Sequence, residues 1–176
     1  MIDNLIQSGQ PFRSRAHPRR WWLLAVAVLG LDVASKAAIS TLMPYGESIP
    51  LTGFFNLVHV WNTGAAFSFL ANAGGWQRYF FIALAFGVSF WLTLELRKPL
   101  PALEAGAYSL ILGGALGNAV DRLLRGHVVD YLDFHLGGWH WPAFNVADIG
   151  IVCGALLMVV ASLRRSSDAS KEEPNE

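Results

Sequence analysis

Four apolar segments, separated by polar and turn-forming stretches, dominate the hydrophobic pattern of this 176-residue chain. Each is close to the ~20 residues that a helix needs to cross the hydrocarbon core of a bilayer. The segments cover residues 21–42, 77–96, 102–124 and 145–163, to within a few residues at each end. The pattern predicts an all-α membrane protein with four transmembrane helices that form one domain over residues 21–163.

The two connections on the opposite side from the chain ends differ in length and character. The longer one, residues 43–76, contains the stretch 54–61, FFNLVHVW, which is rich in aromatic and β-branched residues and alternates in polarity. Such a stretch, bounded by Pro and Gly, indicates a short strand. We expect it to form a small extracytoplasmic β-platform facing the polar ends of the helices, with a second outer loop over residues 125–144.

Composition and charge support a membrane protein and give it an orientation. Hydrophobic residues make up 53% of the chain and charged residues 15%, against about a quarter charged in soluble proteins. The net charge is zero, which gives no reason to expect a nucleic-acid partner. Basic clusters flank the first, second and fourth segments, so the positive-inside rule predicts cytoplasmic termini: a basic arm at residues 1–20 and a polar tail at 164–176.

The basic start followed by an apolar run resembles a cleavable signal peptide. We reject that interpretation because the run continues past Asp32 and further spans follow. The single cysteine, Cys153, excludes a disulfide framework, and we expect it to be a small packed residue. The spacings of His127, His135 and His140 match no common zinc motif, so no metal is expected.

Asp32 and Lys36 are charged residues inside the first apolar segment. Asp32 lies about 16 Å from Trp21 along the helix, near the middle of the membrane, where a charge is costly and is a functional candidate. The two residues are four apart and share a helix face. They form either an ion pair within the helix or a pair from which Lys36 reaches outward to organise a polar site.

The end of the third segment carries a polar stripe of Asn118, Asp121 and Arg122. An arginine at a helix C-terminus interacts favourably with the helix dipole, and the aspartate could simply be solvated there. Neither reason explains Asn118 in an apolar turn. We therefore favour structural support of a functional site.

Asn145 and Asp148 begin the fourth segment in the pattern of a capping box. Capping alone is one interpretation, but fifteen apolar residues follow Asp148, and the short connection before it can return Asp130 to its side. Two carboxylates at a dry position are costly unless they share a proton, as the acid–base pair of aspartic proteases does. Asp133 is expected to be a solvated loop residue.

In such a pair one carboxylate takes a proton from water while the other, protonated, hydrogen-bonds to the scissile carbonyl. Because a helix N-terminus favours negative charge, we expect Asp148 to be the base and Asp130 the acid. Their titrations are coupled, so apparent pKa values belong to the pair.

Several motifs in a fixed order resemble the lipoprotein signal peptidase family, signal peptidase II of bacteria. The motifs are Asp32 with Lys36, NTGAAF at 62–67, GNAVDR at 117–122, VVDY at 128–131 and FNVAD at 144–148. The departures are mild: Val33 stands where the family often has Gln, and Tyr131 where it often has Phe.

The resemblance implies a four-helix intramembrane aspartic endopeptidase of the bacterial inner membrane, without a cofactor. It places the catalytic pair on Asp130 and Asp148 and brings Asn62 and Gly64 near the substrate. It assigns support of the site to Asn118, Asp121, Arg122 and Asn145, with Asp32 and Lys36 beside them. The implied partners are prolipoproteins with a diacylglyceryl-modified Cys, cut just before that residue on the periplasmic side, and membrane lipids. We expect a monomer.

Two other classes of function remain open from the residues. In a proton-linked transporter, Asp32, Lys36, Asp121 and Asp148 would form a relay, although such proteins often show internal repeats and broken spans, which are not visible here. In a non-catalytic assembly factor, replacing Asp130 and Asp148 by Asn would leave function intact.

Overall fold

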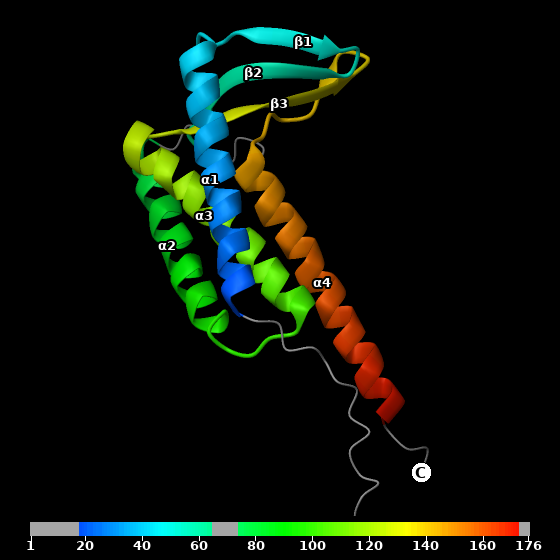
Figure 1. The fold of residues 1–176 in the computed structure, drawn as a ribbon. Helices are drawn as coiled ribbons and strands as arrows, with labels where there is room; N and C mark the ends of the chain where they lie inside the picture. The colour runs from blue at the N-terminus through cyan, green and yellow to red at the C-terminus, as the bar shows by residue number, and fades with distance from the viewer. Residues whose placement is uncertain (1–17, 65–73, 173–176) are drawn as a thin grey trace, which may run out of the picture.

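The computed structural model describes residues 18–64 and 74–172 of the chain. It is mostly helical, with a small antiparallel sheet at one end of the helices (Figure 1). The helices are α1 (Pro18–Leu42), α2 (Trp76–Glu95), α3 (Ala102–Arg125) and α4 (Val146–Glu172). The strands are β1 (Ser48–Thr52), β2 (Phe55–Asn62), β3 (Val128–Leu136) and β4 (Trp139–His140).

The helix α3 is the centre of the bundle and packs against the other three helices. Its small residues make this possible. A side chain at Gly113 would overlap the backbone carbonyl of Ala25 in α1, and one at Gly114 would overlap that of Ala147 in α4. Within a membrane, helices are not driven together by hydrophobicity, so close contact depends on small residues such as these.

Both ends of α3 follow from local sequence. Pro101 precedes the helix, where its missing N–H costs nothing. Gly126 ends it in the left-handed conformation, with φ 86° and its N–H donating to the carbonyl of Arg122 at 3.2 Å. The chain then enters β3 only two residues later, which brings Asp130 back over the helix ends.

The sheet has the strand order β1-β2-β3-β4, with all neighbours antiparallel. The predicted strand over residues 54–61 is confirmed as β2. The strand β3 was not predicted, since it lies in the region expected to be the outer loop 125–144. Val129 and Tyr131 of β3 pack on Ile39 and Met43 at the end of α1. This contact fixes the sheet to the bundle.

Three helices in the described part of the chain are long and apolar enough to cross a membrane: Arg19–Leu42, Trp76–Glu95 and Val146–Ser166. The helix α3 has the expected position, but it does not meet that test. It carries Asp121, Arg122 and Arg125 near its end and is covered by the other helices. Four membrane spans therefore stay a prediction.

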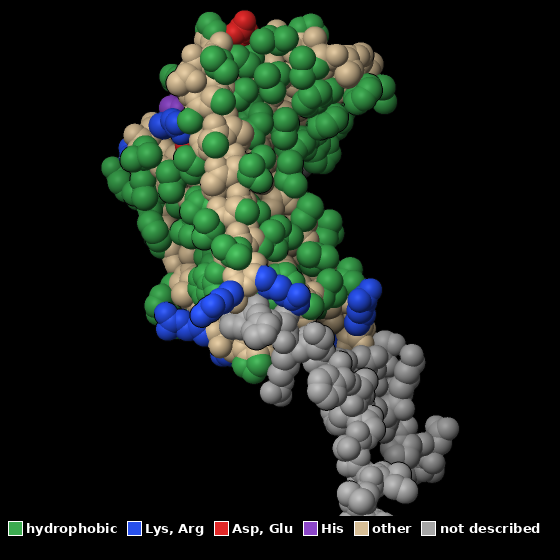
Figure 2. All heavy atoms as spheres, in the orientation of Figure 1, with side chains coloured by type: hydrophobic (Ala, Val, Ile, Leu, Met, Phe, Trp, Pro, Cys, Tyr) green, Lys and Arg blue, Asp and Glu red, His purple; other side chains and the backbone are tan. Residues whose placement is uncertain are grey.

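The surface of the bundle is largely hydrophobic, and Lys and Arg side chains gather at the end opposite the sheet (Figure 2). The basic residues at this end lie in the first turn of α1, just after α2 and in the last part of α4: Arg19, Arg20, Arg97, Lys98, Arg164 and Arg165. Most of the basic arm, residues 1–17, lies outside the described residues. Cys153 was expected to be packed, but it is exposed on α4, so that expectation was wrong.

Candidate active site

Asp130 and Asp148 come together at the sheet end of the bundle, the first from β3 and the second from the first turn of α4. Asn145 connects them. Its side-chain Nδ2 donates to Asp130 Oδ1 at 2.6 Å, and its backbone N–H donates to Asp148 Oδ2 at 3.3 Å. One residue therefore positions both carboxylates.

The predicted capping box is present at the start of α4. Asn145 Oδ1 accepts the backbone N–H of Asp148 at 3.0 Å while Asp148 Oδ2 accepts that of Asn145. Capping and positioning of a carboxylate pair are therefore not alternatives. The same contacts that satisfy the free N–H groups of the helix also fix the orientation of Asp148.

Asp130 is 3% exposed and accepts a second hydrogen bond at Oδ2 from Asn62 Nδ2, at 3.0 Å. Burial, followed by the charge of Asp148, raises the pKa of Asp130 to about 7, although the hydrogen bonds from Asn62 and Asn145 act to lower it. A carboxyl group with such a pKa is partly protonated near neutral pH. It can therefore donate a proton or a hydrogen bond, as a general acid must.

Asn118 of α3 connects the carboxylate pair to α1. Its Nδ2 donates to Asp148 Oδ1 at 2.9 Å, and its Oδ1 accepts from Lys36 Nζ at 2.8 Å. Lys36 in turn lies 2.7 Å from Asp32 Oδ2, and both of these side chains are fully buried. The two interpretations of Lys36 thus combine, because it forms the ion pair within α1 and also reaches Asn118.

Asp32 reaches across the bundle to α4, where its Oδ1 accepts the backbone N–H of Ala147 at 2.8 Å. A side-chain carbon at Gly117 would overlap the Asp32 carboxylate. Gly117 therefore belongs to the site as surely as the polar residues do, since it makes room for a buried charge between α1 and α3.

Asp121 was open to interpretation as a solvated residue at a helix end, and its exposure of 1% excludes this. Its Oδ2 accepts the backbone N–H of Val129 at 3.0 Å and lies 3.6 Å from Lys36 Nζ. Its Oδ1 pairs with Arg125. Asp121 thus fixes the beginning of β3, one residue before Asp130.

Arg122 holds the loop that follows β2. Its Nη2 donates to the backbone carbonyl of Gly64 at 2.5 Å, and its guanidinium lies 5.0 Å from the centre of the Phe81 ring. The N–H of Gly64 donates to Asn62 Oδ1 at 3.0 Å. Asn62 and Gly64 are therefore fixed beside the carboxylates, while residues 65–67 of the same motif lie outside the described residues.

Three contacts near the site were not predicted. Asp133 is 6% exposed and accepts from Asn56 Nδ2 at 2.8 Å, with His140 Nδ1 2.9 Å from its carboxylate. The expectation of a solvated loop residue was therefore wrong. The hydroxyl of Tyr131 donates to Ser35 Oγ at 2.7 Å, which ties β3 to α1. Regular alternation of polar and apolar residues is confined to 133–136, at the end of this strand, and it was the available indication of a strand here.

Relatives of known function match most of the chain. It is 56% identical over 146 residues to the lipoprotein signal peptidase of Ralstonia nicotianae, covering 82% of this chain and 84% of the relative. It is 53% identical over 154 residues to that of Serratia marcescens, covering 85% and 91%. It is 54% identical over 171 residues to that of Cupriavidus necator, covering 94% and 98%.

The fold also matches solved structures described as bacterial membrane enzymes. One superimposes with a TM-score of 0.77 at 32% identity, covering 90% of this chain and 94% of that one. A second has a TM-score of 0.71, also at 32% identity, with coverage of 82% and 93%. A family model for signal peptidase (SPase) II matches residues 24–164. The chain therefore belongs to the signal peptidase II family of membrane-embedded aspartic peptidases.

Proposed function

We propose that this enzyme removes signal peptides from prolipoproteins by cutting the peptide bond just before a diacylglyceryl-modified Cys, with Asp130 and Asp148 as its catalytic residues. Family membership supports the substrate class and the reaction. The observation that carries the proposed site is the pair of carboxylates joined through Asn145, one of them with a pKa near 7.

The proposed reaction uses the two carboxylates in different protonation states. Asp148, at the N-terminus of α4, takes a proton from water, and the resulting nucleophile attacks the scissile carbonyl. Asp130, protonated, hydrogen-bonds to the carbonyl oxygen and stabilises the negative charge that develops there. The proton on Asp148 then passes to the departing amine as the C–N bond breaks.

The place of the pair in the fold fits a substrate that carries acyl chains. Asp130 and Asp148 lie at the sheet end of the helices, and the basic side chains lie at the other end. By the positive-inside rule the basic end is cytoplasmic, so the site would face the periplasmic side of the inner membrane. There the lipid-modified Cys can stay in the outer leaflet while its peptide bond enters the site beside Asn62 and Gly64.

Proton-linked transport is less well supported. The carboxylates of Asp121, Asp130 and Asp148 gather around one end of the bundle, near Asn118 and Asn145. A relay would need titratable groups distributed across the membrane. Asp32 is the deepest carboxylate of the site, and it is held by Lys36 and by Ala147.

The test is cleavage of a synthetic diacylglyceryl-modified prolipoprotein peptide by the purified chain in detergent, with and without a chelator. We expect chelator-resistant cleavage that is lost in Asp130→Asn and in Asp148→Asn. Glu95→Gln, which removes a carboxylate from an exposed ion pair at the other end of α2, is the matched control and should cleave normally. Full activity in both Asp variants would rule out the proposed site, and no cleavage by folded wild-type chain would rule out the proposed reaction.

A further inference from the structure

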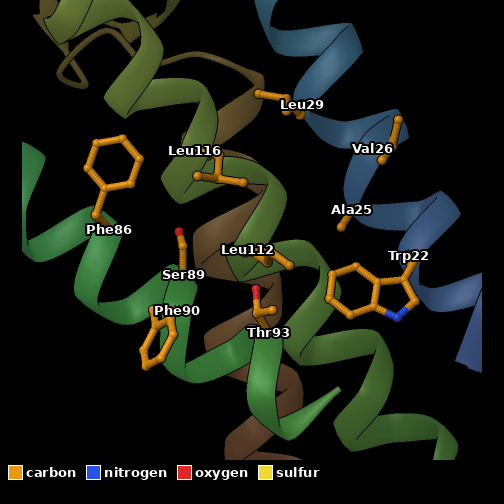
Figure 3. A pocket seen from close by; sticks show the side chains of 10 residues that line it. All are labelled: Trp22, Ala25, Val26, Leu29, Phe86, Ser89, Phe90, Thr93, Leu112 and Leu116. Atoms are coloured by element: carbon orange, nitrogen blue, oxygen red, sulfur yellow. The ribbon is translucent and has the colours of Figure 1, made fainter. Parts of the chain in front are cut away.

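A second feature lies in the opposite half of the bundle, away from the carboxylates. The helices α1 and α2 both pack on α3 but make little contact with each other. Between them is a groove of about 290 Å³, with α3 as its floor (Figure 3). Its walls are almost entirely apolar, and side chains such as Val26 and Phe90 at its edges are more than 60% exposed.

Each wall of the groove continues to an arginine at the basic end. On α1 the lining residues Trp22, Val26 and Leu29 follow a stripe with helical spacing, and Arg19 lies on the same stripe one turn before Trp22. On α2 the lining residues Ser89 and Thr93 are four apart, and the next position of that series is Arg97, just past the helix end. The spacing therefore places one arginine beyond the basic end of each wall.

Polarity changes in a regular order along the groove. The lining residues farthest from the basic end, Leu29, Phe86 and Leu116, are apolar, whereas Thr93 adds a hydroxyl group to the apolar lining nearer the basic end (Figure 3). Arg97 follows Thr93 by four residues and lies just past the end of α2. A hydrocarbon region, then a hydroxyl group, then cations is the order that complements an acyl chain, its ester and a phosphate.

We propose that this groove binds one acyl chain of an anionic phospholipid, with the phosphate held between Arg19 and Arg97. The lipid comes from the leaflet that borders the basic end, which is the cytoplasmic leaflet in the orientation proposed above. The site is separate from the cleavage site, and its occupant completes the packing between α1 and α2.

A lipid fits the groove better than a second transmembrane helix does. A helix with its side chains is about 10–12 Å in diameter, whereas an acyl chain is a single file of methylene groups that can enter between two helices that both pack on α3. A helix would therefore lie across α1 and α2 instead of entering between them, and it would gain nothing specific from the two arginines.

The binding is tested by native mass spectrometry of the full chain, delipidated in detergent and then given equal amounts of dioleoyl phosphatidylglycerol and dioleoyl phosphatidylethanolamine. We expect one phosphatidylglycerol per chain, preferred roughly 10- to 30-fold, because two basic side chains contact its charge. Arg19→Gln/Arg97→Gln should remove the preference. Arg164→Gln/Arg165→Gln, an equal change of charge at the same end of the molecule, should keep it.

A second pair of variants tests the groove itself. Val26→Trp fills it from its exposed wall and should abolish retention of the lipid, whereas Val152→Trp enlarges an equally exposed side chain on α4 and should not. Absence of bound lipid, equal binding of both lipids, or equal retention in the two Trp variants would overturn the proposal. So would a synthetic signal-sequence helix that displaces the lipid from wild-type chain but does not bind Val26→Trp. Because the readout is mass, the Asp148→Asn chain should bind lipid normally whether or not the proposed cleavage site is correct.

Discussion

The two halves of the bundle are held together in different ways. At the sheet end, buried polar side chains join α1, α3 and α4, as in the contact from Lys36 through Asn118 to Asp148. At the basic end, α1 and α2 are separated by an apolar groove. Since lipid tails are as apolar as leucine, helices in a membrane associate tightly only through small residues or polar contacts. Buried polar contacts are therefore concentrated where two carboxylates must be positioned.

The largest effect on stability and cleavage is expected from removing Lys36, the cation at the centre of the polar half. Lys36→Met leaves Asp32 buried without its paired cation, which lies 2.7 Å away, and leaves Asp121 with Arg125 as its remaining ion-pair partner. Breaking a buried ion pair in this way costs about 3–5 kcal/mol. We expect a large loss of thermal stability in detergent, together with loss of cleavage.

Lys98→Met is the matched control at the basic end, because Lys98 forms an exposed pair with Glu95 and such pairs contribute about 0–1 kcal/mol. Adding Asp32→Asn to Lys36→Met should recover part of the lost stability. Equal melting temperatures for the two Lys variants would contradict the difference between the halves.

A smaller loss of stability is expected from adding one methyl group at the contact between α1 and α3. Gly117→Ala would overlap the Asp32 carboxylate, and overpacking of this kind costs about 1–3 kcal/mol. At Gly87 on α2 nothing lies within 4 Å of the added carbon, so Gly87→Ala should be neutral or slightly stabilising. Denaturation of both variants in one detergent measures the difference. A less stable Gly87→Ala chain would show that the lipid-facing side of α2 is packed more tightly than described.

The positions of the helices could be predicted from hydrophobic pattern because a membrane imposes the same length and polarity on every span. The second segment, expected at 77–96, is the helix Trp76–Glu95. The pattern also placed α3, yet that helix falls short of the apolarity of a span. Many of its Gly and Ala residues are buried, so they contact protein instead of lipid. Burial by protein and burial by lipid are not distinguished by hydrophobicity alone.

The strand β3 and the contacts of the site were harder to predict. Residues 128–131 are all buried, because one face of the strand packs on α1 and the other faces the site, so the alternation that indicates a half-buried strand is lost. The cap formed by Asn145 and Asp148 is local and was readable. The hydrogen bond between Asn56 and Asp133 joins residues 77 positions apart in the sequence, so no local sequence pattern could predict it.

The pH dependence of cleavage tests the electrostatics of the polar half. In the proposed mechanism Asp130 acts in its protonated form, and its pKa is raised to about 7 by burial and by Asp148. Cleavage should therefore decrease above about pH 7, approaching a tenfold loss per pH unit as the protonated fraction falls. Since the hydrogen bond from Asn62 lowers this pKa, Asn62→Ala should raise it and move the alkaline limb to higher pH.

Asn56→Ala is the control for that shift, because Asn56 donates to Asp133 and not to Asp130. The measurement is the pH profile of kcat/KM for the three chains. If the alkaline limb stays in place in Asn62→Ala, or moves equally in Asn56→Ala, then the loss of cleavage at high pH does not arise from deprotonation of Asp130.

The smallest effect on stability is expected from removing the neutral hydrogen bond between Tyr131 of β3 and Ser35 of α1. The Tyr131 hydroxyl donates to Ser35 Oγ at 2.7 Å, and its ring is 5% exposed. Tyr131→Phe keeps the ring and removes the bond, which is worth about 0.5–1.5 kcal/mol. Tyr45→Phe, at a side chain 60% exposed, should change nothing. If the bond acts as described, Tyr131→Phe/Ser35→Ala is less destabilised than the sum of the single variants, because each single change already breaks it. Strict additivity would mean that β3 is held on α1 by the packing of Val129 and Tyr131 alone, as apolar contacts hold the other half of the bundle.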